Sequence, residues 1–133
     1  MRPIPPSSAS RPILVVDDDP MVRRLLFWVL TEEGYAVLEA ADGAIALVRV
    51  HEAPPSLILL DMRMPVMDGW EFARRYRALP GPHAPIVCVT AAVDAAARGA
   101  QIEAAATLDK PFNLDELLAV VGHHVPPPAA EAS

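Results

Sequence analysis

The chain has 133 residues, 53% of them hydrophobic, and a formal net charge of −6 at neutral pH. This length fits one domain with its own core. The acidic balance disfavours nucleic acid as a direct partner, because no basic stripe is available to neutralise phosphates. No run of about 18 apolar residues is present, so no membrane span is expected. The single cysteine rules out an internal disulfide and fits a cytoplasmic protein.

The predicted elements alternate between strand and helix. Proline-rich stretches with small residues predict a disordered arm over residues 1–10 and a mobile tail over residues 125–133. One domain is expected between them, over residues 11–124. Short apolar runs predict buried strands, at residues 12–16, 35–39, 57–60, 85–90 and 105–108. Helices are expected over about residues 20–33, 43–51, 69–79, 91–103 and 114–124. This alternation predicts an α/β fold with a parallel sheet between helices.

Residues typical of helix ends support these boundaries. Four side chains stand where an N-cap is expected, namely Asp19, Asp42, Asp68 and Asn113. Glu71 and Glu116 follow two of these caps at the spacing of a capping box. Trp28, in the first helix, is expected to be core or half-buried. Arginines 74, 75 and 77 are expected to form a solvated helix face.

Polar side chains gather where the predicted strands end. Asp17 and Asp18 follow the first strand, Asp61 the third, Thr90 ends the fourth and Lys110 follows the fifth. Parallel strands all end at the same edge of the sheet, where ligands bind in open α/β folds. Three crowded carboxylates resist full ionisation, and a hard divalent cation such as Mg²⁺ relieves this. A lone ammonium and hydroxyl suit a phosphoryl group. Alternatively, the carboxylate after the third strand only caps a turn.

Four motifs carry a family resemblance. They occupy residues 13–20, 60–69, 89–91 and 110–112. In this order and spacing they resemble the response-regulator receiver domain of bacterial two-component signalling, over about residues 11–123. The resemblance implies a flavodoxin-like, doubly wound, five-stranded parallel sheet of order 2-1-3-4-5 with five helices; a chemotaxis receiver is a standard example of that order.

The resemblance also implies the chemistry of phosphorylation. Asp61 would take a phosphoryl group from a phosphohistidine of a sensor histidine kinase or histidine phosphotransfer protein. Lys110 would pair with a phosphoryl oxygen, and Thr90 would swing its hydroxyl toward the new group. The bond between Lys110 and Pro111 is expected to be cis.

A Mg²⁺ site is implied beside this acceptor. Asp18 would bind the ion directly and Asp17 through water, with Asp61 as a further ligand. The backbone carbonyl of Arg63 would complete the protein's share of the ligands.

The expected function is a single-domain response regulator that acts as a switch and not as a conventional enzyme. Its partners would be the kinase and an unidentified downstream protein, or a phosphorelay, without direct contact to nucleic acid or membrane. The chain would be a monomer or weak dimer. Thr107 and Glu103 depart from the family pattern, which commonly has an aromatic residue and a glycine there.

Three alternatives are weighed against this interpretation. A phosphatase of the haloacid-dehalogenase type would use Asp17 and Asp19, but Met21 stands where that class has threonine or valine, and the chain is short for it. A docking-only receiver usually lacks an acidic residue or the lysine. A flavin-binding protein of the flavodoxin type would need a Ser/Thr/Gly-rich first loop in place of carboxylates, which repel phosphate.

Overall fold

The computed structural model describes residues 11–91 and 100–126. Its elements are β1 (Ile13–Val16), α1 (Pro20–Glu32), β2 (Val37–Ala40), α2 (Gly43–Glu52), β3 (Leu57–Leu60), α3 (Gly69–Ala78), β4 (Ile86–Ala91), β5 (Ala106–Lys110) and α5 (Leu114–His124). The helix expected over residues 91–103 lies largely outside the described residues, and Ala91 is the last residue of β4. Within the described ranges, no helix has the length and apolar character needed to cross a bilayer.

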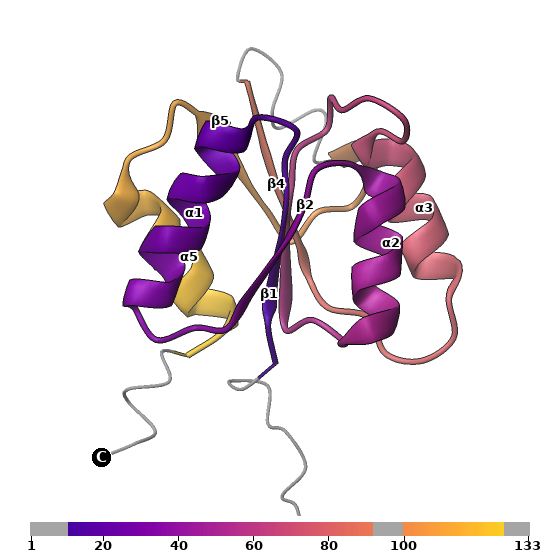
Figure 1. The fold of residues 1–133 in the computed structure, drawn as a ribbon, viewed down its shortest axis with the longest axis horizontal. Helices are drawn as coiled ribbons and strands as arrows, with labels where there is room; N and C mark the ends of the chain where they lie inside the picture. Colours follow the sequence, from indigo (N-terminus) through magenta and orange to yellow (C-terminus); the bar gives the residue numbers. More distant parts are fainter. Residues whose placement is uncertain (1–10, 92–99, 127–133) are drawn as a thin grey trace, which may run out of the picture.

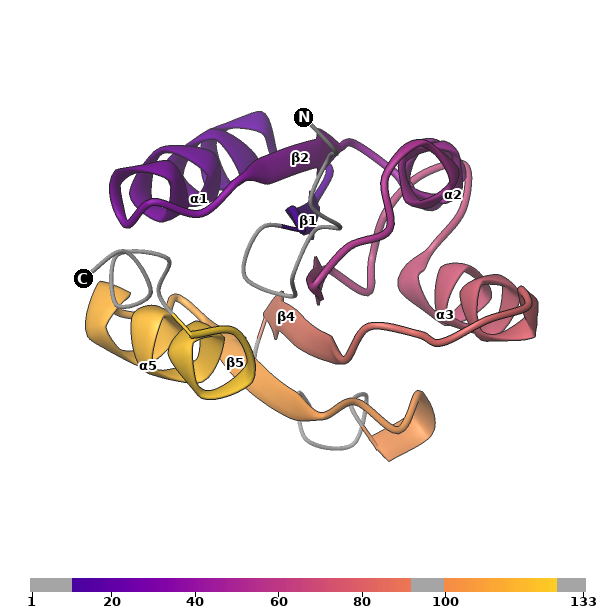
Figure 2. The same ribbon diagram turned by 90° about the horizontal axis from the view of Figure 1, so that it is seen from below.

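The five strands form one parallel sheet of order β2-β1-β3-β4-β5. Helices α1 and α5 cover one face, and α2 and α3 cover the other (Figures 1 and 2). The predicted parallel α/β fold and the doubly wound strand order implied by the family resemblance are therefore confirmed. At the carboxyl edge, Val16 of β1 is in register with both Ala40 of β2 and Leu60 of β3. The residues that follow these strands are thereby brought to one level.

The core consists of two layers, one on each face of the sheet. All residues of β1 and β3 are buried, so both strands are continuous apolar runs without polar alternation. Phe72 and Tyr76 of α3 pack on one face, and Leu26 and Leu30 of α1 on the other. The packed part of the chain reaches Val125, which is buried and whose carbonyl accepts a hydrogen bond from the Tyr35 hydroxyl.

The predicted N-caps are confirmed, but the reciprocal bond of the predicted capping boxes is not: the Glu116 carboxylate accepts from the Asn113 side-chain amide at 2.8 Å. The side chains of Asp19, Asp42, Asp68 and Asn113 all accept backbone N–H groups of the helices that they precede. Asp68 accepts from the backbone of Glu71 at 2.9 Å. The Glu71 carboxylate, however, pairs with Arg74 and Arg75. Charge-assisted bonds to two guanidinium groups are stronger than one to a backbone N–H, which explains the difference.

Two predictions about side-chain exposure are wrong. Trp28 is 64% exposed, because it is two positions from the buried Leu26 and Leu30 and therefore lies on the opposite side of α1. Arg77 is not part of a simply solvated face. Its guanidinium donates hydrogen bonds to the carbonyls of Ile102 and Glu103 and ties α3 to the segment before β5.

Glu103 adopts a left-handed backbone conformation that favours glycine. Its φ is 52°, and its backbone N–H donates to Ala100 at 3.2 Å. A side chain in this conformation costs about 1 kcal/mol relative to glycine. We therefore expect Glu103→Gly to stabilise the fold by up to that amount in urea unfolding. Arg77 keeps its contacts in this variant, because they go to backbone carbonyls.

Glu103→Ala is the matched control for this prediction. It removes the same carboxylate but keeps a Cβ atom in the left-handed conformation, so no comparable gain is expected. Equal stabilisation by alanine and glycine would show that charge, and not backbone conformation, limits stability at this position.

Candidate functional site

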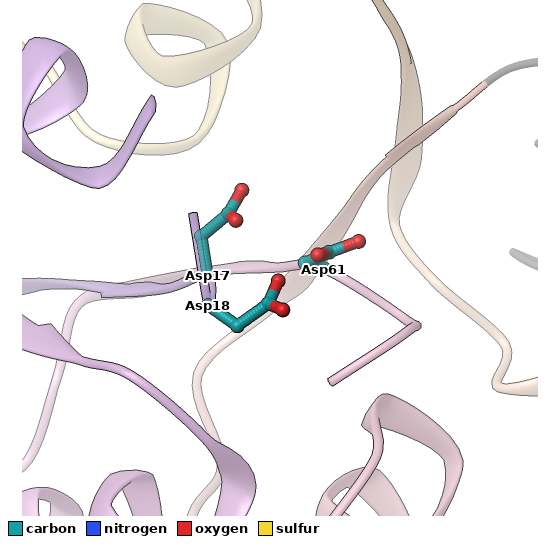
Figure 3. Close-up of side chains that lie close together, drawn as sticks. All are labelled: Asp17, Asp18 and Asp61. Atoms are coloured by element: carbon teal, nitrogen blue, oxygen red, sulfur yellow. The ribbon is translucent and has the colours of Figure 1, made fainter. Parts of the chain in front are cut away.

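The site begins with the neighbouring ends of β1 and β3. Asp61 donates its backbone N–H to the carbonyl of Val16 at 2.9 Å, which continues the pairing of the two strands by one residue. Asp17 in turn donates to the carbonyl of Ala40, at the end of β2. Asp17 and Asp18 therefore leave the sheet beside Asp61, as Figure 3 shows.

Three carboxylates converge at this edge. One oxygen each from Asp17, Asp18 and Asp61 lies within 4.8 Å of the other two. Asp17 and Asp61 are only 2% and 7% exposed, whereas Asp18 is exposed to solvent. The donors are all oxygen atoms on a crowded, negatively charged edge, a set that suits a hard divalent cation such as Mg²⁺. The structure thus brings together the three carboxylates that the sequence predicted.

A lysine ammonium faces these carboxylates. Lys110, the last residue of β5, places its Nζ 2.7 Å from Asp17 Oδ2 and 3.7 Å from Asp61 Oδ2. Burial lowers the pKa of Lys110, but the hydrogen bond to Asp17 and the charges of Asp17 and Asp61 outweigh it, so the pKa is raised. The ammonium is therefore charged at neutral pH. The predicted cis peptide bond before Pro111 is confirmed.

Asp61 carries an unfavourable charge. Burial, followed by repulsion from Asp17, raises its pKa from 3.8 to about 6; Lys110 and the backbone N–H of Arg63 oppose this rise. Asp18 adds a smaller repulsion. One ammonium thus does not offset three carboxylates, and the site retains an excess of negative charge that a divalent cation would compensate.

Thr90 and Arg63 belong to the strand and the loop next to the acceptor. Thr90 is 2% exposed in β4, in register with Asp109, the residue before Lys110. Because Leu60 is in register with Cys88, Thr90 lies one residue beyond the level of Asp61. The Arg63 backbone N–H bonds to the Asp61 carboxylate, and its side chain is exposed.

Glycines allow the loops beside the acceptor to approach closely. A Cβ atom on Gly69 would lie 2.7 Å from Met62 Sδ and 2.8 Å from the Asp61 carbonyl. A Cβ atom on Gly43 would lie 2.8 Å from the Met67 carbonyl. Neither glycine was predicted to have a role, although each directly follows an N-cap aspartate. They let α2 and α3 begin against the loop that carries Asp61.

Arg23 and Glu39 also contact the site, and neither was predicted to do so. Arg23 Nη1 donates to the Asp17 carbonyl at 2.7 Å, and its Nε lies 3.3 Å from Glu39 Oε1. Both residues belong to elements predicted from the sequence, but nothing in their spacing indicates that they meet beside the loop of residues 17–19 between β1 and α1, the acidic loop.

Comparison with known proteins identifies the family. Residues 13–122 match the model of the response regulator receiver domain. Response regulator MprA from Mycobacterium sp. (strain KMS) and from Mycobacterium avium (strain 104) are each 43% identical to this chain over 109 residues, 80% of the chain. The chain spans about half, 47%, of the length of these curated relatives.

Solved structures agree in fold. Response regulator TrrA from Thermotoga maritima, in complex with Mg²⁺ and BeF, has a TM-score of 0.77 at 35% identity, covering 86% of this chain and 99% of that one. Chemotaxis response regulator CheY4 of Vibrio cholerae has a TM-score of 0.79 at 32% identity, covering 87% and 99%. Together with the family match, these likenesses show that the chain belongs to the response regulator receiver domain family.

Proposed function

We propose that this receiver domain accepts a phosphoryl group on Asp61 from a phosphohistidine of a sensor histidine kinase or histidine phosphotransfer protein. The observation that carries the proposal is the position of Asp61 at the end of the central strand. Its carboxylate lies beside those of Asp17 and Asp18 and 3.7 Å from the Lys110 ammonium. Such a group is a nucleophile next to both a cation and a metal-binding pair.

The chain's own residues account for most of the transfer. An Asp61 oxygen attacks phosphorus as the phosphorus–nitrogen bond to the donor imidazole breaks, and the imidazole leaves with its nitrogen lone pair. Lys110, already beside this carboxylate, pairs with a phosphoryl oxygen. The Thr90 hydroxyl donates to another oxygen of the transferred group. Because the transferring group carries spread negative charge, positioning and electrostatic stabilisation are the main contributions.

Asp17, Asp18 and Asp61 would hold a Mg²⁺ ion, with the backbone carbonyl of Arg63 as a further ligand. When bound, the ion offsets negative charge on the carboxylates and on the incoming phosphoryl oxygens. The oxygen-only donor set and the raised pKa of Asp61 support this assignment.

The output is proposed to be a change in protein contacts. A phosphoryl group adds close to two negative charges beside Lys110 and Thr90 and can bias two conformations of this edge. We infer that the domain is a cytoplasmic switch, a monomer or weak dimer, that signals to a protein partner or passes its phosphoryl group on. Thr107 is exposed on β5, so this switch would operate without an aromatic side chain there.

Intact mass spectrometry after incubation with Mg²⁺ and acetyl phosphate tests the acceptor. The parent should gain one phosphoryl group, and Asp61→Asn should gain none. Asp42→Asn is the matched control, because it makes the same chemical change at a helix cap where asparagine serves equally well. It should be labelled like the parent, and chelation of Mg²⁺ should abolish labelling of both.

Other outcomes would contradict the proposal in distinct ways. Labelling of Asp61→Asn at the parental level would place the acceptor elsewhere. Rapid multiple turnover of simple phosphomonoesters would favour a phosphatase. If neither labelling nor binding of a stable phosphoryl mimic such as BeF₃⁻ occurs, the domain acts by docking alone.

A further inference from the structure

The backbone N–H, the carbonyl and both carboxylate oxygens of Asp17 are all hydrogen-bonded. Its backbone N–H donates to Ala40, and its two carboxylate oxygens accept from the Asp19 backbone and from Lys110, at 2.9 and 2.7 Å. Its carbonyl, at the start of the acidic loop, accepts from Arg23 Nη1 at 2.7 Å. The last of these contacts comes from the second turn of α1 and holds the backbone between Asp17 and Asp18.

Glu39 holds the Arg23 side chain in this position. Glu39 lies on the edge strand β2, in register with Val15 of β1. Its Oε1 lies 3.3 Å from Arg23 Nε. Its own carbonyl accepts from Arg49 Nε at 3.0 Å, which ties the same residue to α2. The exposed fractions of the Arg23 and Glu39 side chains are 20% and 24%, so solvent screens this pair less than an open surface pair.

We propose that Arg23 is a positioning residue for the metal ligands Asp17 and Asp18, and that Glu39 orients Arg23 for this purpose. The proposal rests on the proposed function, because it concerns how the same Mg²⁺ site is built. The planar guanidinium contacts the Asp17 carbonyl with one nitrogen and Glu39 with another. The direction in which the Asp18 side chain leaves the backbone then depends on a residue that contacts no metal.

Charge alone predicts the opposite effect, which makes the inference testable. Arg23 is a cation near three carboxylates that are to bind a cation. If it acted only through its charge, removing it would strengthen Mg²⁺ binding. If it positions the ligands, removing it weakens Mg²⁺ binding in spite of the change in charge.

Arg24 provides a control in the same helix turn. Its Nη1 pairs with the same Glu39 at 2.9 Å and its guanidinium lies 5.1 Å from the centre of the Phe27 ring. Its side chain is 71% exposed, and the Asp17 carbonyl accepts from Arg23 instead. Arg24→Met therefore removes one positive charge and one Glu39 partner while leaving the Arg23–Asp17 contact in place.

Isothermal titration calorimetry with MgCl₂ on the unphosphorylated full chain separates these effects. We expect Arg23→Met to weaken Mg²⁺ binding about tenfold, as is typical when a residue that orients a metal ligand is lost. Arg24→Met should bind as tightly as the parent or slightly tighter. Arg23→Lys keeps the charge but not the planar group, so it should restore only part of the affinity.

Coupling to Glu39 is the second readout. In the parent, Glu39→Gln should weaken Mg²⁺ binding; with methionine already at position 23 the same change should have little further effect. Hydrogen exchange of the Asp18 and Asp19 amides should speed up in Arg23→Met and not in Arg24→Met. This measurement reports the loop directly, even where a variant is less stable.

The possible outcomes are distinct. Equal or tighter Mg²⁺ binding by Arg23→Met would overturn the positioning role and leave the proposed function intact, as would equal exchange rates in the two methionine variants. A parent that binds no Mg²⁺ would contradict the metal site itself, and the inference with it.

Discussion

Without metal, Asp61→Asn is expected to be more stable than the parent at neutral pH, by about 1 kcal/mol after allowing for solvent screening. The pKa of Asp61 is raised to about 6, first by burial and then by Asp17, so its ionised form is unfavourable in the folded state. Asparagine removes this charge and leaves Lys110 its 2.7 Å contact with Asp17. Such a cost in stability fits the trade-off between stability and function known for functional sites.

The pH dependence has a definite sign. A carboxyl group whose pKa is raised in the folded state favours folding while it is protonated. Its contribution is fully present below its ordinary pKa of 3.8 and is lost as pH rises through about 6. In urea unfolding with EDTA present, the free energy of unfolding of the parent should therefore fall below that of Asp61→Asn between about pH 4 and about pH 7. The two free energies should be equal at the acid end of this range.

Magnesium should reverse this order. A ligand that binds only the folded state stabilises it by about 1.4 kcal/mol for each tenfold excess over its dissociation constant. The parent should gain this stability and Asp61→Asn should gain less, because it has lost a carboxylate ligand. Asp42→Asn, at an exposed helix cap, should show neither effect. If the stabilities of Asp61→Asn and Asp42→Asn depend on pH in the same way, then the ionised form of Asp61 is not disfavoured by burial and by its neighbours.

The sequence predicted the sheet and the acidic cluster well, because both follow from local patterns. Continuous apolar runs identified β1 and β3, since a strand covered on both faces has no polar side. Parallel order then placed Asp17, Asp18 and Asp61 at one edge without any knowledge of side-chain packing. Cap residues marked the helix starts to within a residue.

The misses concern contacts between elements far apart in the chain. Arg77 reaches the carbonyls of Ile102 and Glu103, and Arg23 reaches Glu39 and Asp17, yet a long arginine on a helix surface has the same sequence pattern whether or not it finds a partner. A local backbone conformation, at Val66, was also not predicted. Its φ of 69° is unusual for a β-branched residue, and the Met67 N–H donates back to the Pro65 carbonyl at 2.7 Å.

Lys110→Met should destabilise the metal-free protein at neutral pH by about 3 kcal/mol, the order expected when one partner of a buried ion pair is removed. The Lys110 ammonium is close to both Asp17 and Asp61, and its own side chain is only 20% exposed. Without it, the three carboxylates lose the ammonium that pairs directly with Asp17 and Asp61. The pKa of Asp61 should rise further, because Lys110 is the largest influence that lowers it.

A double-mutant cycle distinguishes this charge effect from lost packing. Asp61→Asn should stabilise the Lys110→Met variant by more than it stabilises the parent, because it removes a repulsion that no longer has an opposing cation. Saturating Mg²⁺ should restore much of the stability that Lys110→Met loses. Lys110→Arg should lose little stability, because it keeps the positive charge. Additive effects in the cycle, with no recovery in Mg²⁺, would mean that the Lys110 side chain contributes through its methylene groups and that the carboxylates tolerate one another unaided.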